Sequence, residues 1–109
     1  MKIYEKLVRD RIPEIIKARG ANCETRTLTQ AEYKAALRVK LSEEVSEYLE
    51  SGALSELADI YEVIRALAAF DGHDDGALET ARAEKERTRG AFEQRRSLIS
   101  VAEDKPPHV

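Results

Sequence analysis

With 109 residues and a formal net charge of -3 at pH 7, the chain is long enough for one domain with a modest core. It lacks the basic excess that a duplex nucleic acid or an anionic membrane surface requires. Charged residues make up 36% and aromatic residues 6% of the chain, a balance typical of helix-rich proteins.

Cysteine usage and hydropathy indicate where such a domain works. The one cysteine, Cys23, has no partner for an internal disulfide and no metal-ligand spacing around it. No apolar run approaches membrane-spanning length, and Glu5 and Asp10 come too early for a signal peptide. We therefore expect a reduced, cytoplasmic protein with a single domain over residues 1–102 and a flexible tail over residues 103–109.

Proline, glycine and capping residues divide the chain into four predicted helices. Pro13 opens the first helix, and Thr29 forms a capping box with Glu32 at the start of the second. Glycines close the first, second and fourth helices, whereas a glycine-containing turn follows the third. The third helix begins at Ser55 or just before it. The predicted ranges are residues 13–19, 29 to 48 or 49, 55–70 and about 77–89.

Two short segments outside the helices have a strand-like pattern. Residues 24–28 alternate and carry β-branched side chains, and residues 96–101 could pair with them. The predicted fold is therefore an all-α antiparallel helical bundle with a small β pairing at its edge. Because a domain of this size gains stability from a second subunit, we expect a homodimer or a higher oligomer.

Five acids lie close together in the middle of the chain. On the second helix, at about 100° per residue, Glu44 falls about 60° from Leu41 and beside Leu37, at the border of the apolar stripe. Glu47 lies further round and Glu43 further still, so Glu43 is expected to be the most solvent-facing of the three. The apolar residues expected in the core of this helix are Leu37, Leu41, Val45 and Tyr48.

The other two acids lie on the third helix. Glu56 shares a side with Ile60, Val63 and Leu67, and Asp59 stands beside Val63 at i+3. A solvated acid has no reason to occupy an apolar face. The expected core of this helix comprises Leu57, Ile60, Tyr61, Ile64 and Ala68.

Carboxylates at i and i+3 on two antiparallel helices would converge on one site. Like charges one turn apart repel, and desolvating an unpaired carboxylate costs several times more than that repulsion, so a shared cation would remove both costs. Oxygen ligands without histidine or cysteine select a hard cation, Mg²⁺ or Mn²⁺. The alternative is a solvated acidic face, which is the usual role of glutamate-rich helices.

The order of three motifs resembles the MazG-like all-α nucleoside triphosphate pyrophosphohydrolases. The central motif is Lys40-Leu41-x-Glu43-Glu44-x-x-Glu47 followed by Glu56-Leu57-Ala58-Asp59. The opening stretch of residues 4–16 and the late Lys85-x-x-x-Arg89-Gly90-Ala91-Phe92 resemble the phosphoribosyl-ATP pyrophosphohydrolase-like subgroup. Two departures are a short linker between Glu47 and Glu56 and Ala91 where a second glycine is common.

The resemblance implies Mg²⁺-dependent hydrolysis of a nucleotide between its α- and β-phosphates, giving a monophosphate and pyrophosphate. The implied metal ligands are Glu44, Glu47, Glu56 and Asp59. Glu43, in an outer position or orienting the water, and Glu47 are the implied catalytic residues. The implied contacts to the substrate phosphates come from Arg9, Lys40, Lys85 and Arg89. The alternative for Lys40, Lys85 and Arg89 is ordinary surface ion pairing, and the alternatives for Arg9 are a solvated charge cluster or a contact between subunits.

Three other functions fit parts of the pattern. A hydrolase acting on phosphoribosyl-ATP shares the chemistry and differs in its pocket. A non-catalytic helical dimerisation module would use the same amphipathic helices without a metal. A redox dimetal-carboxylate bundle should carry Glu-x-x-His pairs, and no glutamate here has a histidine three residues later, so it is disfavoured.

Overall fold

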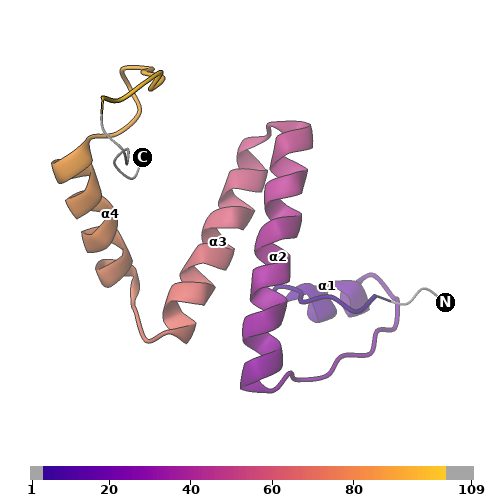
Figure 1. The fold of residues 1–109 in the computed structure, drawn as a ribbon. Coiled ribbons are helices and arrows are strands. Elements are labelled where there is room, and N and C mark those ends of the chain that lie inside the picture. Colours follow the sequence, from indigo (N-terminus) through magenta and orange to yellow (C-terminus); the bar gives the residue numbers. More distant parts are fainter. Residues whose placement is uncertain (1–3, 103–109) are drawn as a thin grey trace. The chain divides into compact units, whose positions relative to one another are not determined.

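The computed structural model describes residues 4–102, and within that range it contains four α-helices and no β-strand (Figure 1). The prediction of an all-α protein with four helices is confirmed. The chain divides into two compact units, Met1–Leu78 and Glu79–Val109. The expected tail at 103–109 lies outside the described residues. The helices are α1 (Ile12–Ala18), α2 (Gln30–Ser51), α3 (Leu54–Phe70) and α4 (Asp75–Arg89).

The start of α2 is fixed by the predicted capping box. The backbone N–H of Glu32 donates to the Thr29 hydroxyl at 3.2 Å, and the N–H of Thr29 donates to the Glu32 carboxylate at 2.9 Å. The Thr29 N–H, together with the Arg26 guanidinium, lowers the pKa of Glu32 to about 2. The capping carboxylate is therefore ionised at neutral pH, as the box requires.

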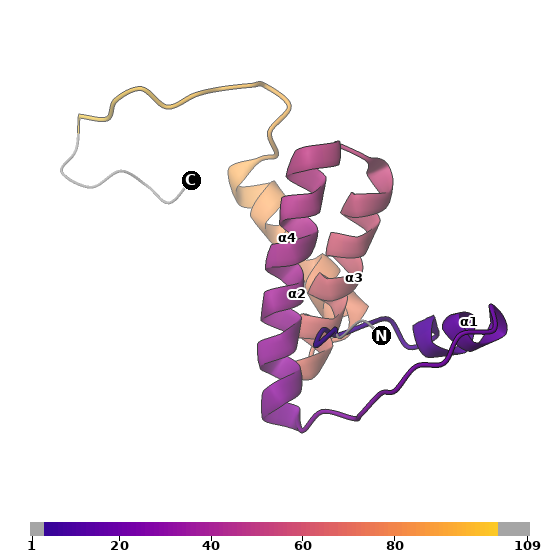
Figure 2. The ribbon, with the colours of Figure 1, turned by 90° about the vertical axis from the view of Figure 1, so that its right-hand side faces the viewer.

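An antiparallel hairpin of α2 and α3 forms the centre of the first unit (Figures 1 and 2). Gly52 closes α2 in the left-handed conformation, with a φ of 65°, and a two-residue connection leads into α3. Leu37 and Val63 are the buried apolar residues among those described. Leu37 belongs to the face predicted to be packed on α2, and Val63 lies on the side of α3 that carries Glu56.

Part of the predicted core is exposed instead. Leu57, Tyr61 and Ile64 of α3 are 42%, 58% and 37% exposed, and Val45 of α2 is also exposed. These three α3 residues form a second apolar stripe, beside the stripe that contains Val63. A single neighbouring helix covers one stripe only, because an apolar face packed on one partner spans roughly 100°. In the described part of the chain, α2 and α3 are the one pair of helices packed together.

The predicted β pairing is wrong. Residues 24–28 and 96–101 form no strand, and nearly all of their side chains are exposed. An isolated two-stranded pairing is at best marginally stable in water, so β-branched composition alone could not hold these segments together.

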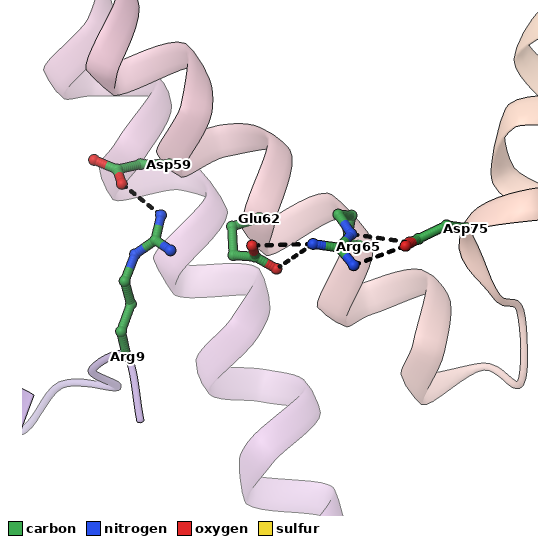
Figure 3. Close-up of polar contacts among 5 residues, drawn as sticks. All are labelled: Arg9, Asp59, Glu62, Arg65 and Asp75. Atoms are coloured by element: carbon green, nitrogen blue, oxygen red, sulfur yellow. Dashed lines mark hydrogen bonds and ion pairs between the residues drawn. The ribbon is translucent and has the colours of Figure 1, made fainter. Parts of the chain in front are cut away.

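The fourth helix begins at Asp75, two residues before the predicted start at Ala77. The Asp74 carboxylate accepts a hydrogen bond from the Ala77 N–H at 2.8 Å, which caps this end. Arg65 of α3 donates twice to Asp75, at 2.9 and 2.7 Å, and also contacts Glu62 (Figure 3). This bidentate pair fixes the end of α3 to the first turn of α4.

Further along, α4 is exposed and carries ion pairs one turn apart. Arg82 binds Glu79 at 2.6 Å and Glu86 at 3.0 Å, and Arg87 binds Glu84 at 2.6 Å. Such pairs support an exposed helix by a few tenths of a kcal/mol each. None of the described helices combines the length and apolar character that crossing a membrane would require.

Candidate metal centre

Three of the predicted metal ligands come together between α2 and α3. Glu44 lies about two turns before Gly52, and Glu56 and Asp59 lie in the first two turns after it. The antiparallel hairpin therefore brings the acids of both helices to the same level. Glu44, Glu56 and Asp59 each offer a carboxylate oxygen, and these oxygens lie within 4.8 Å of one another.

Glu44 distinguishes this cluster from a solvated acidic face. The residue is 6% exposed, the one buried charged residue among those described. Its Oε1 forms an ion pair with Lys40 at 3.2 Å, whereas its Oε2 is buried and, with the neighbouring Glu47 ionised, has no hydrogen-bond partner. Leaving a buried charged oxygen unpaired is costly, so this oxygen is a fitting ligand for a cation.

Glu47 lies outside the triad and responds to its charge. A hydrogen bond that the protonated Glu47 can donate to Glu44, together with repulsion from Glu44 and Glu56, raises the pKa of Glu47 above its usual 4.5. Two neighbouring carboxylates retain a proton more strongly than one. The cluster therefore holds more negative charge than its own cations neutralise.

The raised pKa predicts the pH dependence of the metal-free protein. Because folded Glu47 binds its proton more tightly than unfolded Glu47, the free energy of unfolding should fall as pH rises above about 4.5. We expect Glu47→Gln to lose this part of the pH dependence and to be more stable than the wild type at pH 7 in EDTA. Thermal unfolding, followed by circular dichroism at pH 5 and pH 7, measures the change in stability of each protein.

A matched control is available on the same helix. Glu50 is exposed and forms no ion pair among the described residues, so Glu50→Gln removes one charge away from the cluster. If Glu50→Gln changed the pH dependence as much as Glu47→Gln, the interpretation of Glu47 would be wrong.

Arg9 reaches the cluster from the segment before α1. Its Nη2 donates to Asp59 Oδ1 at 2.7 Å, across 50 positions of sequence (Figure 3). Arg9 was predicted to contact substrate, and its contact with Asp59 was not foreseen. No periodicity or spacing links a residue outside a helix to one so distant in sequence.

The burial of the two remaining acids of α2 is the reverse of the expected order. Glu43 is half-buried and Glu47 is exposed. The expectation that Glu43 faces solvent most is wrong because Lys40, whose side chain is itself 20% exposed, contacts Glu43 at 3.8 Å and shields part of it. Lys40 thus takes the ion-pairing role, on Glu43 and Glu44 together.

The two predicted basic residues of α4 belong to the second unit. Lys85 and Arg89 are exposed, and neither forms an ion pair among the described residues. Their predicted role at the substrate phosphates stays a prediction.

The ligand chemistry of the cluster matches a hard divalent cation. The converging donors are carboxylate oxygens, which suit Mg²⁺ or Mn²⁺. Carboxylates in a solvated acidic face are hydrated by water and need no other partner. The buried, unpaired Oε2 of Glu44 therefore favours a bound cation over a solvated acidic face. Glu44, Glu56 and Asp59 would hold the ion, with Glu47 beside them.

Comparison with known proteins gives one partial likeness. No protein-family model matches the chain, and no solved structure matches it. An uncharacterized protein of Mycolicibacterium smegmatis is 60% identical over 42 residues, which are 38% of this chain and 43% of that relative. The likeness therefore spans less than half of either protein.

Proposed function

We propose that the protein is a Mg²⁺-dependent nucleotide pyrophosphohydrolase that cleaves a nucleoside triphosphate to the monophosphate and pyrophosphate. The observation that carries the proposal is the convergence of Glu44, Glu56 and Asp59 with one buried carboxylate oxygen left unpaired. The step from a hard cation to nucleotide phosphates rests on the resemblance of the three motifs. Mn²⁺ could replace Mg²⁺ at such a site.

In the proposed reaction, water attacks the α-phosphorus, and the bond from that phosphorus to the oxygen that bridges the α- and β-phosphates breaks. A bound Mg²⁺ would neutralise charge on the phosphate oxygens and lower the pKa of the attacking water. Glu47, which is exposed beside the triad, can accept the proton that the water loses. Pyrophosphate then leaves with the electron pair of the broken bond. Glu43 would orient the water from its half-buried position.

The phosphates of the substrate also need cationic partners. Arg9 supports this role best, because it already lies at a carboxylate of the cluster and its side chain is half exposed. Planar guanidinium groups bind phosphate oxygens in pairs. Lys40, Lys85 and Arg89 remain proposed phosphate contacts on the strength of the motifs. The proposal places the activity in the cytoplasm, where nucleoside triphosphates are found.

A substrate screen tests the activity. Common and damaged nucleoside triphosphates are incubated with the protein and Mg²⁺, and released pyrophosphate is distinguished from orthophosphate. We expect pyrophosphate and the monophosphate in equal amounts from at least one substrate, and none in EDTA. Phosphoribosyl-ATP belongs in the screen, because turnover of that compound alone would favour the biosynthetic alternative. If no compound is turned over, the proposal that the protein is an enzyme of this class is refuted.

A helical dimerisation module is the second candidate function, and the exposed α3 stripe favours it. Such a module needs no metal, so Mg²⁺ should leave its thermal stability unchanged. An enzyme with the proposed site should instead unfold at a higher temperature when Mg²⁺ is added, because a ligand that binds only the folded state stabilises it.

We also propose that the α2–α3 hairpin completes an antiparallel bundle with a second copy of the chain. Leu54, Leu57, Tyr61 and Ile64 recur at spacings of three and four residues on the exposed side of α3. This is the spacing of helices that pack side by side. Light scattering of the purified protein should give at least twice the mass of 12.3 kDa. A monomer at micromolar concentration would contradict the oligomer and leave the metal site unaffected.

A further inference from the structure

The acidic cluster already has two cationic neighbours, and they differ in how they are held. Lys40 lies on the same helix as Glu44, one turn before it, and its side chain is 20% exposed. Arg9 lies in a segment without helix or strand before α1, and its side chain is 52% exposed. Lys40 is thus fixed by its helix, whereas Arg9 lies in the turn that leads into α1, where its carbonyl accepts a hydrogen bond from the Ile12 N–H at 3.1 Å.

The Arg9 contact is also the kind of ion pair that exchanges easily. Asp59 is 37% exposed, and the pair is made through one guanidinium nitrogen and one carboxylate oxygen at 2.7 Å (Figure 3). Ion pairs between exposed groups contribute little to stability, because water competes for both partners. A divalent cation at the same carboxylates would outcompete such a pair.

A cation bound by Glu44, Glu56 and Asp59 would lie close to the Arg9 guanidinium. The oxygens of these three acids are within 4.8 Å of one another, and Arg9 occupies an oxygen of Asp59. A divalent cation and the Arg9 guanidinium would repel each other if they shared the Asp59 carboxylate. The cation carries the higher charge, so it is attracted more strongly by the remaining acids.

We propose that Arg9 is a tethered substitute cation, which pairs with Asp59 while the metal is absent and is displaced when a divalent cation binds. Displacement removes the tie that Arg9 makes between the segment before α1 and the hairpin, and it leaves the Arg9 guanidinium available to an anionic ligand. By reciprocity, whatever holds Arg9 on Asp59 weakens metal binding to the same extent. The inference rests on the metal site of the proposed function and is independent of hydrolysis.

The displacement of Arg9 from Asp59 is tested by measuring the affinity of the protein for a divalent cation in the absence of nucleotide. Binding of Mn²⁺ alone is measured by isothermal titration calorimetry for the wild type, Arg9→Gln and Arg11→Gln. We expect Arg9→Gln to bind Mn²⁺ about two- to fivefold more tightly, which corresponds to the loss of one exposed ion pair. Arg11 is the matched control, because it is two residues away and contacts Glu14 at 3.8 Å, away from the cluster. Arg11→Gln should bind as the wild type does.

A second readout follows the segment itself. Limited trypsin digestion after Lys6 and Arg11 should be faster with Mn²⁺ than with EDTA in the wild type, whereas digestion after Arg26 provides an internal reference. In Arg9→Gln, digestion should be fast under both conditions.

The outcomes separate this inference from the proposed function. Equal or weaker Mn²⁺ binding by Arg9→Gln, or an equal gain in Arg11→Gln, would overturn the displacement while the metal site stands. Digestion that Mn²⁺ does not accelerate would overturn it as well. Failure of the wild type to bind Mn²⁺ would overturn both the displacement and the metal site. Binding and displacement without nucleotide turnover would refute only the hydrolase.

Discussion

Replacing Glu56 by glutamine is expected to reduce Mg²⁺-dependent pyrophosphate release by about 100-fold or more. Even groups that only support a metal ligand cost 10- to 100-fold when changed, so a direct ligand should reach the upper end. Glutamine keeps the size of the side chain and its place on the half-buried face of α3. The loss should therefore come from charge and coordination, and not from packing. Pyrophosphate release at saturating substrate over a range of Mg²⁺ concentrations measures it.

The control for this variant must remove a glutamate charge without touching the cluster. Glu50→Gln does so on α2, and it should retain the wild-type rate within about twofold, because surface substitutions away from special features have small effects. Circular dichroism should show the same helix content in both variants. Activity of Glu56→Gln close to that of Glu50→Gln would exclude Glu56 as a metal ligand.

Local signals in the sequence predicted the helices and part of the site. The capping box at Thr29, the glycine at position 52 and the apolar period of α2 each act within a few residues, so they can be recognised without a structure. The position of Glu56 on the same side as Val63 follows from one helical period, and so does the position of Glu44 beside Leu37. Two acids placed on facing stripes were enough to predict their convergence.

The features that could not be predicted from the sequence depend on contacts between residues that are distant along the chain. Tyr61 and Val63 are both apolar positions of α3, yet only Val63 is buried, because the choice depends on which stripe α2 covers. The contact of Arg9 with Asp59 depends on the path of a segment without regular structure. The error about residues 24–28 has the same origin, since a strand needs a neighbour that composition cannot supply.

The short connection at Gly52 explains why the site is built from these particular acids. A tight antiparallel turn aligns residues that are at similar distances before and after it, so Glu44 comes close to Glu56 and Asp59. Inserting residues into the connection would shift one helix relative to the other and separate the carboxylates. The shortness of the linker, which departs from many of the proteins that the sequence resembles, therefore bears directly on the geometry of the acidic triad proposed to hold the cation.

Glu44→Ala should lose most of the stabilisation that Mg²⁺ gives to the folded protein, and Glu43→Ala should lose much less. At a Mg²⁺ concentration about 100 times the dissociation constant, binding stabilises the folded state by about 2.7 kcal/mol. A variant that binds 100-fold more weakly would keep only about 0.4 kcal/mol under the same conditions. Glu44 is a member of the triad and has a buried, unpaired oxygen, whereas Glu43 lies outside the triad and pairs with Lys40.

The measurement compares each variant with itself, in Mg²⁺ and in EDTA, by chemical unfolding. This difference removes the packing and desolvation effects of the substitution, which act with and without the metal. It matters for Glu44, because truncating a buried carboxylate removes an unpaired oxygen and also leaves Lys40 with fewer partners. Equal losses in Glu44→Ala and Glu43→Ala would mean that long-range attraction by the whole acidic face holds the cation. A larger loss in Glu44→Ala would instead locate the cation at Glu44, between the two helices.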